Sequence, residues 1–176
     1  MGNVFIHLVM SLDGFIARHD DDSSWMFKYG SDEMAGRTMK EVGAVVLGNG
    51  GLGEGVTKDR LPYGGINVPQ FVVTHHARSP LTTGGLTFTF VTEGIERAVA
   101  LAKEAAGDKS VALIGASIDQ QCLKAGLVDE IVIHLAPLVL GDGVRFVDHL
   151  DSQVELKREE LVSTGQITSL RFSVVK

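Results

Sequence analysis

The segment 113–146, LIGASIDQQCLKAGLVDEIVIHLAPLVLGDGVRF, constrains the fold more than any other part of the chain. A strand leads into a turn of small residues and a short helix, and a long apolar strand then ends at Pro137 and a glycine loop. The pair Ser117 and Gln120 matches a capping box for the helix, and Gly126 closes it. Such a turn directs free backbone N–H groups toward an anion. The segment therefore predicts a nucleotide-dependent enzyme.

Apolar segments of strand length recur along the chain. Six of them are predicted strands: Val4–Met10, Ala44–Leu47, Gln70–Thr74, Leu86–Val91, Val111–Ile114 and Ile131–Leu135. Two more strands, Glu155–Thr164 and Thr168–Val175, are predicted on either side of Gly165.

Three helices are predicted between these strands. The first is capped by Ser31 and runs for about 11 residues. Another, Gly94–Ala106, has Thr92 as its cap, and the third follows Ser117. The segment 48–55 is predicted to be a loop, because five of its eight residues are glycine.

This order predicts a single α/β domain over residues 1–176. Strands alternate with helices as far as the middle of the chain and then dominate. The expected sheet is mixed and mostly parallel, flanked by helices and extended by antiparallel C-terminal strands. Ligands of such sheets bind outside the carboxyl ends of the parallel strands. The loops after Met10, Leu47, Thr74, Ile114 and Pro137 are therefore the candidate site.

Composition excludes several classes of partner. The net charge is −6 and no Lys/Arg-rich block occurs, so a nucleic-acid partner is not expected. No apolar run approaches the roughly 20 residues needed to cross a bilayer, and the N-terminus does not read as a signal peptide. These features predict a cytoplasmic protein without a membrane partner. The one cysteine, Cys122, is expected in the core.

Read together, the loops at the strand ends resemble the dihydrofolate-reductase-like superfamily, in particular bacterial proteins related to the reductase domain of riboflavin biosynthesis. The matching segments cover nearly the whole chain: MSLDGFIA, VVLG, FVVTHHAR, GLTFTFVTEGIERAVALAKEAAG, GASIDQQCLKAGLVDEIVIHLAPLVLGDGVRF and SLRFSVVK. The resemblance implies an eight-stranded mixed sheet, an NADPH site along the strand ends and often a homodimer. The long apolar strand Ile131–Leu140 is a candidate for the dimer interface.

The resemblance also implies which residues hold the cofactor. Gly115 and Ala116 would turn against the pyrophosphate, with N–H groups near Ser117 and Ile118 donating to it. Arg78 would contact the 2′-phosphate. The other cofactor residues implied are Ile16, Ala17, Leu47, Gly48, Asn49, Thr74, His75, His76, Leu140 and Gly141.

Several of these residues have a simpler interpretation as well. Gly115 also suits a plain strand–helix turn, and the two histidines also suit an exposed loop rather than a metal site. The family usually has an arginine where this chain has Asn49 and a second glycine where it has Ile114. NADH is therefore a possible cofactor beside NADPH.

The substrate end centres on two carboxylates. The resemblance implies Phe15, Trp25 and Asp32 or Glu33 as candidate substrate contacts. The proton would come from an ordered water or from a carboxylate such as Asp13 or Asp32. Each has an alternative: Asp13 suits a turn, Trp25 suits the core, and Asp32 and Glu33 suit a helix N-terminus. His134 is expected to be a hydrogen-bonded core histidine.

The predicted function is an NAD(P)H-dependent reductase that transfers hydride to a small heterocycle, such as a pterin or a ribityl-aminopyrimidine-like compound. Positioning of donor and acceptor would supply much of the catalysis. The main alternative is a non-catalytic binding protein with an altered cofactor site on the same fold, and a third is a structural dimer module.

Overall fold

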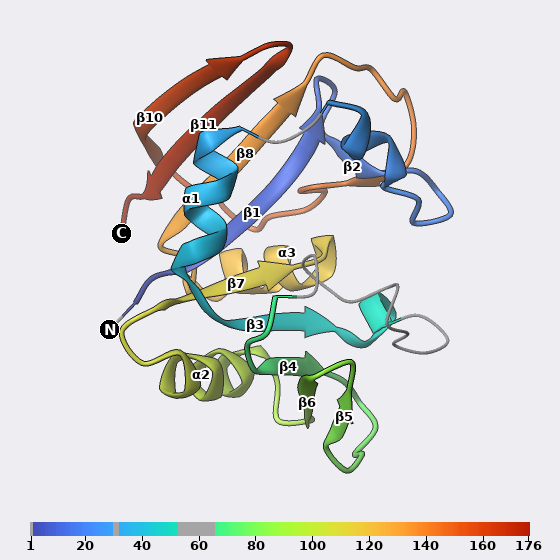
Figure 1. The fold of residues 1–176 in the computed structure, drawn as a ribbon, viewed down its shortest axis with the longest axis vertical. Helices are drawn as coiled ribbons and strands as arrows, with labels where there is room; N and C mark the ends of the chain where they lie inside the picture. Colours follow the sequence, from blue (N-terminus) through green and yellow to red (C-terminus); the bar gives the residue numbers. More distant parts are fainter. Residues whose placement is uncertain (1, 30–31, 53–65) are drawn as a thin grey trace.

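Nine strands form one mixed sheet at the centre of the molecule (Figure 1). The computed structural model describes residues 2–29, 32–52 and 66–176. The strand order is β10 (Leu156–Thr164), β11 (Ile167–Val174), β8 (Glu130–Ala136), β1 (Val4–Ser11), β7 (Ser110–Ile114), β3 (Val42–Gly48), β4 (Gln70–Val73), β6 (Leu86–Val91) and β5 (Leu81–Thr83).

The sheet confirms the predicted mixture of directions. The strands from β8 to β6 are mutually parallel, and β10, β11 and β5 are antiparallel to their neighbours. The expected number of eight strands was too low, because the short β5 adds a ninth. A separate two-stranded sheet pairs β2 (Phe15–Ala17) with β9 (Val144–Arg145).

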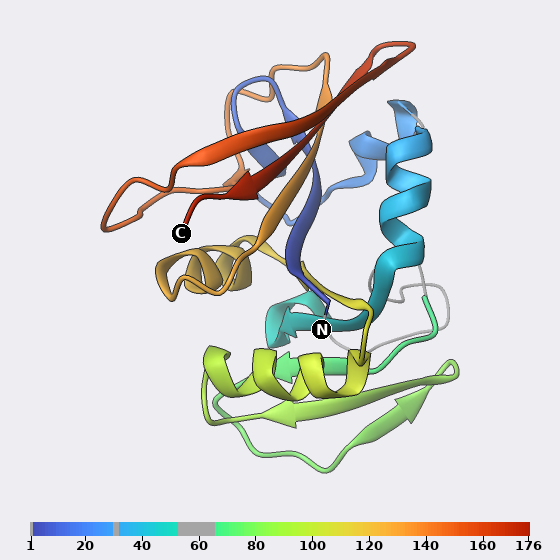
Figure 2. The ribbon, with the colours of Figure 1, turned by 90° about the vertical axis from the view of Figure 1, so that its left-hand side faces the viewer.

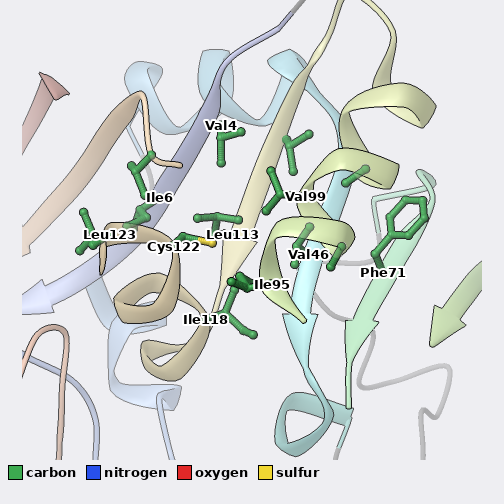
Figure 3. Packing of buried hydrophobic residues seen from close by; sticks show 14 of the residues in the cluster. Val4, Ile6, Val46, Phe71, Ile95, Val99, Leu113, Ile118, Cys122 and Leu123 are labelled. Atoms are coloured by element: carbon green, nitrogen blue, oxygen red, sulfur yellow. The ribbon is translucent and has the colours of Figure 1, made fainter. Parts of the chain in front are cut away.

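Helices cover both faces of the central strands, with α1 (Glu33–Glu41) on one side and α3 (Ala116–Lys124) on the other (Figure 2). On the α3 side, Val4 and Ile6 of β1 share one core cluster with Val99 of α2 (Ile95–Ala106) and with Cys122 (Figure 3). The residue between them, Phe5, belongs to a second cluster. Because both faces of β1 are buried, its consecutive residues are apolar, whereas a strand with one exposed face has an apolar residue at every second position.

Two predicted helix caps were wrong. Gly94 and Gly115, both with positive φ, occupy the N-cap positions of α2 and α3. Thr92 instead bonds to its neighbour Glu93, and Ser117 lies inside α3. The first helix is capped by the Asp32 side chain, which accepts from the Ala35 N–H; the predicted cap Ser31 lies outside the described residues.

The glycine-rich segment begins with a short 3₁₀ helix, η2 (Asn49–Leu52), where a loop was predicted. A single 3₁₀ turn fixes few residues, so it forms where a longer helix would not. Residues 53–55 of the predicted loop lie outside the described residues. A second 3₁₀ helix, η1 (Ser24–Tyr29), precedes α1.

The strand β8 lies inside the sheet, between β1 and β11. Burial within the sheet accounts for its apolar sequence, and both of its edges are already paired. Pro137 and Val139, at the end of the segment suggested for a dimer interface, are exposed, and the homodimer stays a prediction. None of the helices in the described ranges is long and apolar enough to cross a membrane.

Candidate functional site

The predicted cofactor residues gather at one edge of the sheet. Leu47 pairs with Ile114, and Gly48 pairs with Val73, so β7, β3 and β4 end side by side. Because these strands are parallel, their following loops share the carboxyl edge of the sheet. Three loops distant in sequence, at Asn49, Thr74 and Gly115, are thus brought together, as the sequence predicted.

The turn into α3 keeps its backbone accessible. Gly115 has a φ of +99°, and among the described residues no heavy atom lies within 4 Å of the position that a Cβ would take. No side chain caps the helix within the described part of the chain. The first N–H groups of α3 are therefore available to an anion. Ser117 is exposed, whereas Ile118 is buried and offers only its backbone.

Two buried oxygens lie at this edge without a hydrogen-bond partner among the described residues, Asn49 Oδ1 and Asp119 Oδ1. Burial raises the pKa of Asp119 to about 8. The raised pKa favours the neutral carboxyl, which does not repel a phosphate group. Asn49 Oδ1 can accept a hydrogen bond from a ligand hydroxyl or amide, and a dinucleotide carries both kinds of donor.

The loop after β4 presents its basic residue at the surface. Thr74 is buried, and its hydroxyl accepts from the His76 N–H at 3.2 Å. His75 and His76 are exposed. Arg78 is also exposed, and its guanidinium lies 5.6 Å from the centre of the Phe90 ring. Its contact with a 2′-phosphate stays a prediction.

A cavity of about 360 Å³ opens beside the start of α3. It is lined by Phe15, Ala116, Gln120, residues 141–145 and Asp148. Arg145 lies 4.5 Å from the centre of the Phe15 ring, in cation–π geometry. The cavity thus combines a helix start and one cation, Arg145, with two carboxylates, Asp142 and Asp148.

Asp13 ties two loops together at the end of β1. Its carboxylate accepts from the Ser11 hydroxyl at 2.6 Å and from the N–H groups of Leu140 and Gly141 at 3.1 and 2.7 Å. The Ser11 hydrogen bond, with those from the backbone, lowers the pKa of Asp13 to about 2. An ionised group with these three donors is suited to holding a loop, which favours the turn interpretation over the proton donor.

On the α1 side, the candidate residues Asp32 and Glu33 differ in exposure. Asp32 is buried as the cap of α1, whereas Glu33 is exposed and lies 4.0 Å from Arg37 Nε. Trp25 packs in a small cluster with Ala136 and Ile167. Its indole nitrogen is buried and has no partner among the described residues.

Asp32 begins a continuous hydrogen-bonded chain of three buried polar residues and the partly buried His7. Its Oδ2 accepts a very short hydrogen bond from Ser169 Oγ. Ser169 Oγ lies 2.5 Å from His134 Nδ1, and His134 Nε2 lies 2.8 Å from His7 Nε2. The chain therefore crosses from α1 through β11 and β8 to β1. It confirms that His134 is a hydrogen-bonded core histidine.

The hydrogen-bonded groups from Asp32 to His7 have a defined charge state. Burial alone would raise the pKa of Asp32, but hydrogen bonds from Ser169 and from the Ala35 N–H outweigh it and hold the pKa below its ordinary value. Burial, aided by His134 and Arg171, lowers the pKa of His7 to about 3. Burial also lowers the pKa of His134, although the Asp32 carboxylate opposes the shift. At pH 7 the aspartate is ionised and both histidines are neutral.

Comparison with known proteins identifies the family. The profile of the RibD C-terminal domain matches residues 3–170. The chain belongs to the RibD C-terminal domain family. Its sheet, with antiparallel C-terminal strands, is the dihydrofolate-reductase-like fold expected for a RibD C-terminal domain.

Relatives of the RibD C-terminal domain family match over most of the chain. The uncharacterised Bacillus subtilis (strain 168) protein YwjB is 25% identical over 95% of both chains. A Shewanella sp. PV-4 structure named for riboflavin biosynthesis is 22% identical, with a TM-score of 0.79 over 99% of both chains.

A third similar protein is longer. The Thermotoga maritima diaminohydroxyphosphoribosylaminopyrimidine deaminase/5-amino-6-(5-phosphoribosylamino)uracil reductase is 14% identical, with a TM-score of 0.68. The match covers 99% of this chain and 57% of that one. At such identities the two solved structures show the shared fold of the RibD C-terminal domain.

Three residues of the site were missed in the sequence. Ser169 lies in the alternating strand β11 and His7 in the apolar strand β1, and only the pairing of β11 with β8 and of β8 with β1 brings them to Asp32. Arg145 reaches the cavity because β9 pairs with β2. No local pattern signals any of these pairings, since each depends on the register of strands far apart in this RibD C-terminal domain.

Proposed function

We propose that this RibD C-terminal domain is an NADPH-dependent reductase of a small pyrimidine- or pterin-like heterocycle. The observation that carries the proposal is the uncapped start of α3 at Gly115, which faces a cavity containing Arg145. The helix start and the arginine suit a pyrophosphate, and the exposed Arg78 suits a 2′-phosphate.

The chain's own residues would divide the work. The β7–α3 turn binds the phosphates, and Asn49 accepts a hydrogen bond from the cofactor. When bound, the nicotinamide supplies a hydride. Holding the nicotinamide and the heterocycle together replaces their encounter in solution, which lowers the activation free energy by several kcal/mol.

The test is a titration with NADPH and NADH, followed by cofactor fluorescence. We expect saturable NADPH binding with a Kd of roughly 1–100 µM. Arg78→Ala should weaken NADPH about tenfold or more and leave NADH unchanged, because only NADPH carries the 2′-phosphate. Arg145→Ala should weaken both cofactors, since both carry the pyrophosphate.

Arg158→Ala, which removes an exposed arginine of β10, is the matched control and should change neither affinity. Absence of saturable binding of either cofactor at millimolar concentration would refute the proposal. A second assay follows NADPH consumption with 5-amino-6-(5-phosphoribosylamino)uracil, the compound in the name of the Thermotoga maritima protein.

A second candidate function is a non-catalytic binding protein on the same fold. Asn49 favours it, because an amide at a phosphate site lacks the charge of the arginine usual in the family. This alternative predicts that a nucleotide binds without any consumption of NADPH by the heterocycles tested.

A further inference from the structure

The first turn of α3 carries a buried carboxyl group. Asp119 is 2% exposed, and its Oδ1 has no hydrogen-bond partner among the described residues. Its backbone N–H donates to the Gly115 carbonyl at 3.0 Å, which closes the first turn of the helix. Asp119 therefore lies within one helical turn of the free N–H groups that form the proposed phosphate site.

The strands and the helix that pack against α3 bring no cation to Asp119. The strands β3 and β7 contain no ionisable residue. The one ionisable residue of β1, His7, lies on the α1 side of the sheet, where it contacts His134. Burial raises the pKa of the Cys122 thiol to about 12, and the carboxyl groups of Asp119 and of Glu96 in α2 add to that shift. The titratable neighbours of Asp119 on this side are thus themselves acidic.

The loop on the other side of α3 does not supply a counter-ion either. It brings Asp142, Arg145 and Asp148 to the wall of the cavity, where Arg145 stacks on Phe15. Burial is the cause of the raised pKa of Asp119, and no charge in the described part of the chain opposes it. A buried carboxyl without a counter-ion is held in its neutral form, because an uncompensated charge in the interior is costly.

We propose that anion binding at the start of α3 is linked to a proton, and that Asp119 is the residue that must hold this proton. The proposal rests on the reductase function proposed above, because the anion is the pyrophosphate of the cofactor. A neutral Asp119 leaves the positive end of α3 to the ligand. An ionised Asp119 places a negative charge in the same turn and in a medium of low dielectric constant, where it repels the pyrophosphate. This effect acts through the field at the helix start and does not require Asp119 to touch the ligand.

The coupling between proton and ligand is reciprocal. If the proton strengthens anion binding, a bound anion strengthens proton binding by the same factor. The pKa of Asp119, about 8 in the free protein, therefore rises when the cofactor binds. At lower pH Asp119 is already neutral, so binding takes up no proton. At higher pH, binding draws a proton from the solvent, and the affinity for the cofactor falls as the pH increases.

Calorimetric titration with NADH tests this linkage. NADH is chosen because the 2′-phosphate of NADPH itself titrates near a pH of about 6. In the wild type we expect the Kd to rise roughly fivefold or more between pH values of about 7 and about 9.5. Titrations at about pH 9 in buffers of different ionisation enthalpy should show a net uptake of protons on binding.

Two replacements of Asp119 remove the titrating group. Asp119→Asn keeps a polar side chain of the same size, whereas Asp119→Leu has a similar volume and no polar atom. Both variants should bind NADH with a Kd that is nearly constant over this pH range and without proton uptake. Because each variant is compared with itself at the lower pH, a change in packing does not imitate the effect. Asp20→Asn removes an exposed aspartate of another loop and, as the matched control, should keep the wild-type pH dependence.

The outcomes separate the linkage from the reductase proposal. A wild-type Kd that varies with pH no more than that of Asp119→Asn, without proton uptake, would overturn the linkage and leave cofactor binding intact. The ligand-free protein should also show an infrared band of a protonated carboxyl at about pH 7 that is missing in Asp119→Asn, and its absence from the wild type would overturn the linkage too. No saturable binding of NADH or NADPH at about pH 6, where Asp119 is neutral, would instead refute the cofactor site, and the linkage with it.

Discussion

The Nε2 atoms of His7 and His134 lie 2.8 Å apart, between β1 and β8. Two imidazoles in such contact share one proton between their facing nitrogens, and both cannot be charged without strong repulsion. The folded protein therefore keeps the pair neutral, whereas the unfolded chain lets each histidine titrate near its ordinary pKa.

The first prediction concerns acid stability. The pKa of His7 is about 3 in the folded protein and 6.5 without the fold. Between these values the unfolded chain binds more protons, so the free energy of unfolding falls as the pH drops from 6.5 toward 3. His7→Gln should remove up to about 1.4 kcal/mol of this loss for each pH unit. Urea denaturation at several pH values measures the difference, and equal pH slopes for both proteins would contradict it.

The second prediction has the opposite sign. The folded-state pKa of Asp119, about 8, lies above its ordinary value of 3.8. The folded protein therefore binds the extra proton, and stability is lost as the pH rises from 3.8 to about 8. Asp119→Asn should be as stable as the wild type below pH 3.8. Above it, the variant should gain up to about 1.4 kcal/mol over the wild type for each pH unit between 3.8 and about 8. Thermal unfolding checks this against the exposed Asp20→Asn; a constant difference at all pH values would refute it.

The parallel core could be predicted because burial on both faces leaves a direct trace in the sequence. Each central strand is an apolar run, and the strand-end glycines mark where the chain turns. The caps were mispredicted because Thr92 and Ser117 match a hydrogen-bonding pattern, but glycines with positive φ hold the capping positions. Local patterns do not record which of two neighbouring residues begins the helix.

The hydrogen-bonded chain from Asp32 to His7 could also not be predicted from the sequence, and the reason is different. Asp32 and Ser169 are separated by 137 positions. Their contact requires α1 to lie over β11, and no short-range pattern encodes that placement. The sequence identified Asp32 as a candidate carboxylate near a helix start and His134 as a core histidine in an apolar strand, but it did not indicate that one hydroxyl joins them.

A third prediction concerns the loop held by Asp13. In Asp13→Ala, the N–H groups of Leu140 and Gly141 lose their acceptor. Amide hydrogen exchange at these two positions should quicken, while exchange in β8 stays unchanged. Asp20→Ala is the control, since Asp20 is an exposed aspartate in the neighbouring loop. Equal exchange rates in Asp13→Ala and wild type would show that the contact does not hold the loop.

A fourth prediction uses a close approach between β2 and β9. A Cβ on Gly143 would lie 2.2 Å from the Ala17 carbonyl oxygen, and the φ there is +137°. Gly143→Ala should separate the two strands and lower the Tm. Gly141→Ala is a control that also has a positive φ, but with open space among the described residues. Its cost should stay near 1–2 kcal/mol. A Gly143→Ala protein as stable as Gly141→Ala would refute the steric argument.

A fifth prediction restores charge at the cofactor edge. Asn49→Arg places a cation after β3, next to the start of α3. A charge-assisted hydrogen bond to phosphate should tighten NADPH by about tenfold or more. The uncharged Asn49→Gln, of intermediate length, should not. Calorimetry compares the two, and an arginine variant that binds no better would place the phosphates away from this loop.

The central position of β1 has a consequence for how the protein is made. Its pairing with β7 spans 107 positions, from Val4 to Val111. At a synthesis rate of about 5–20 residues per second, β1 waits roughly 5–20 s for its partners. During that interval an apolar strand has two unpaired edges, each a template for another chain. The unpaired edges of β1 are therefore exposed for longer when translation is slower, and chaperone demand should rise as translation slows.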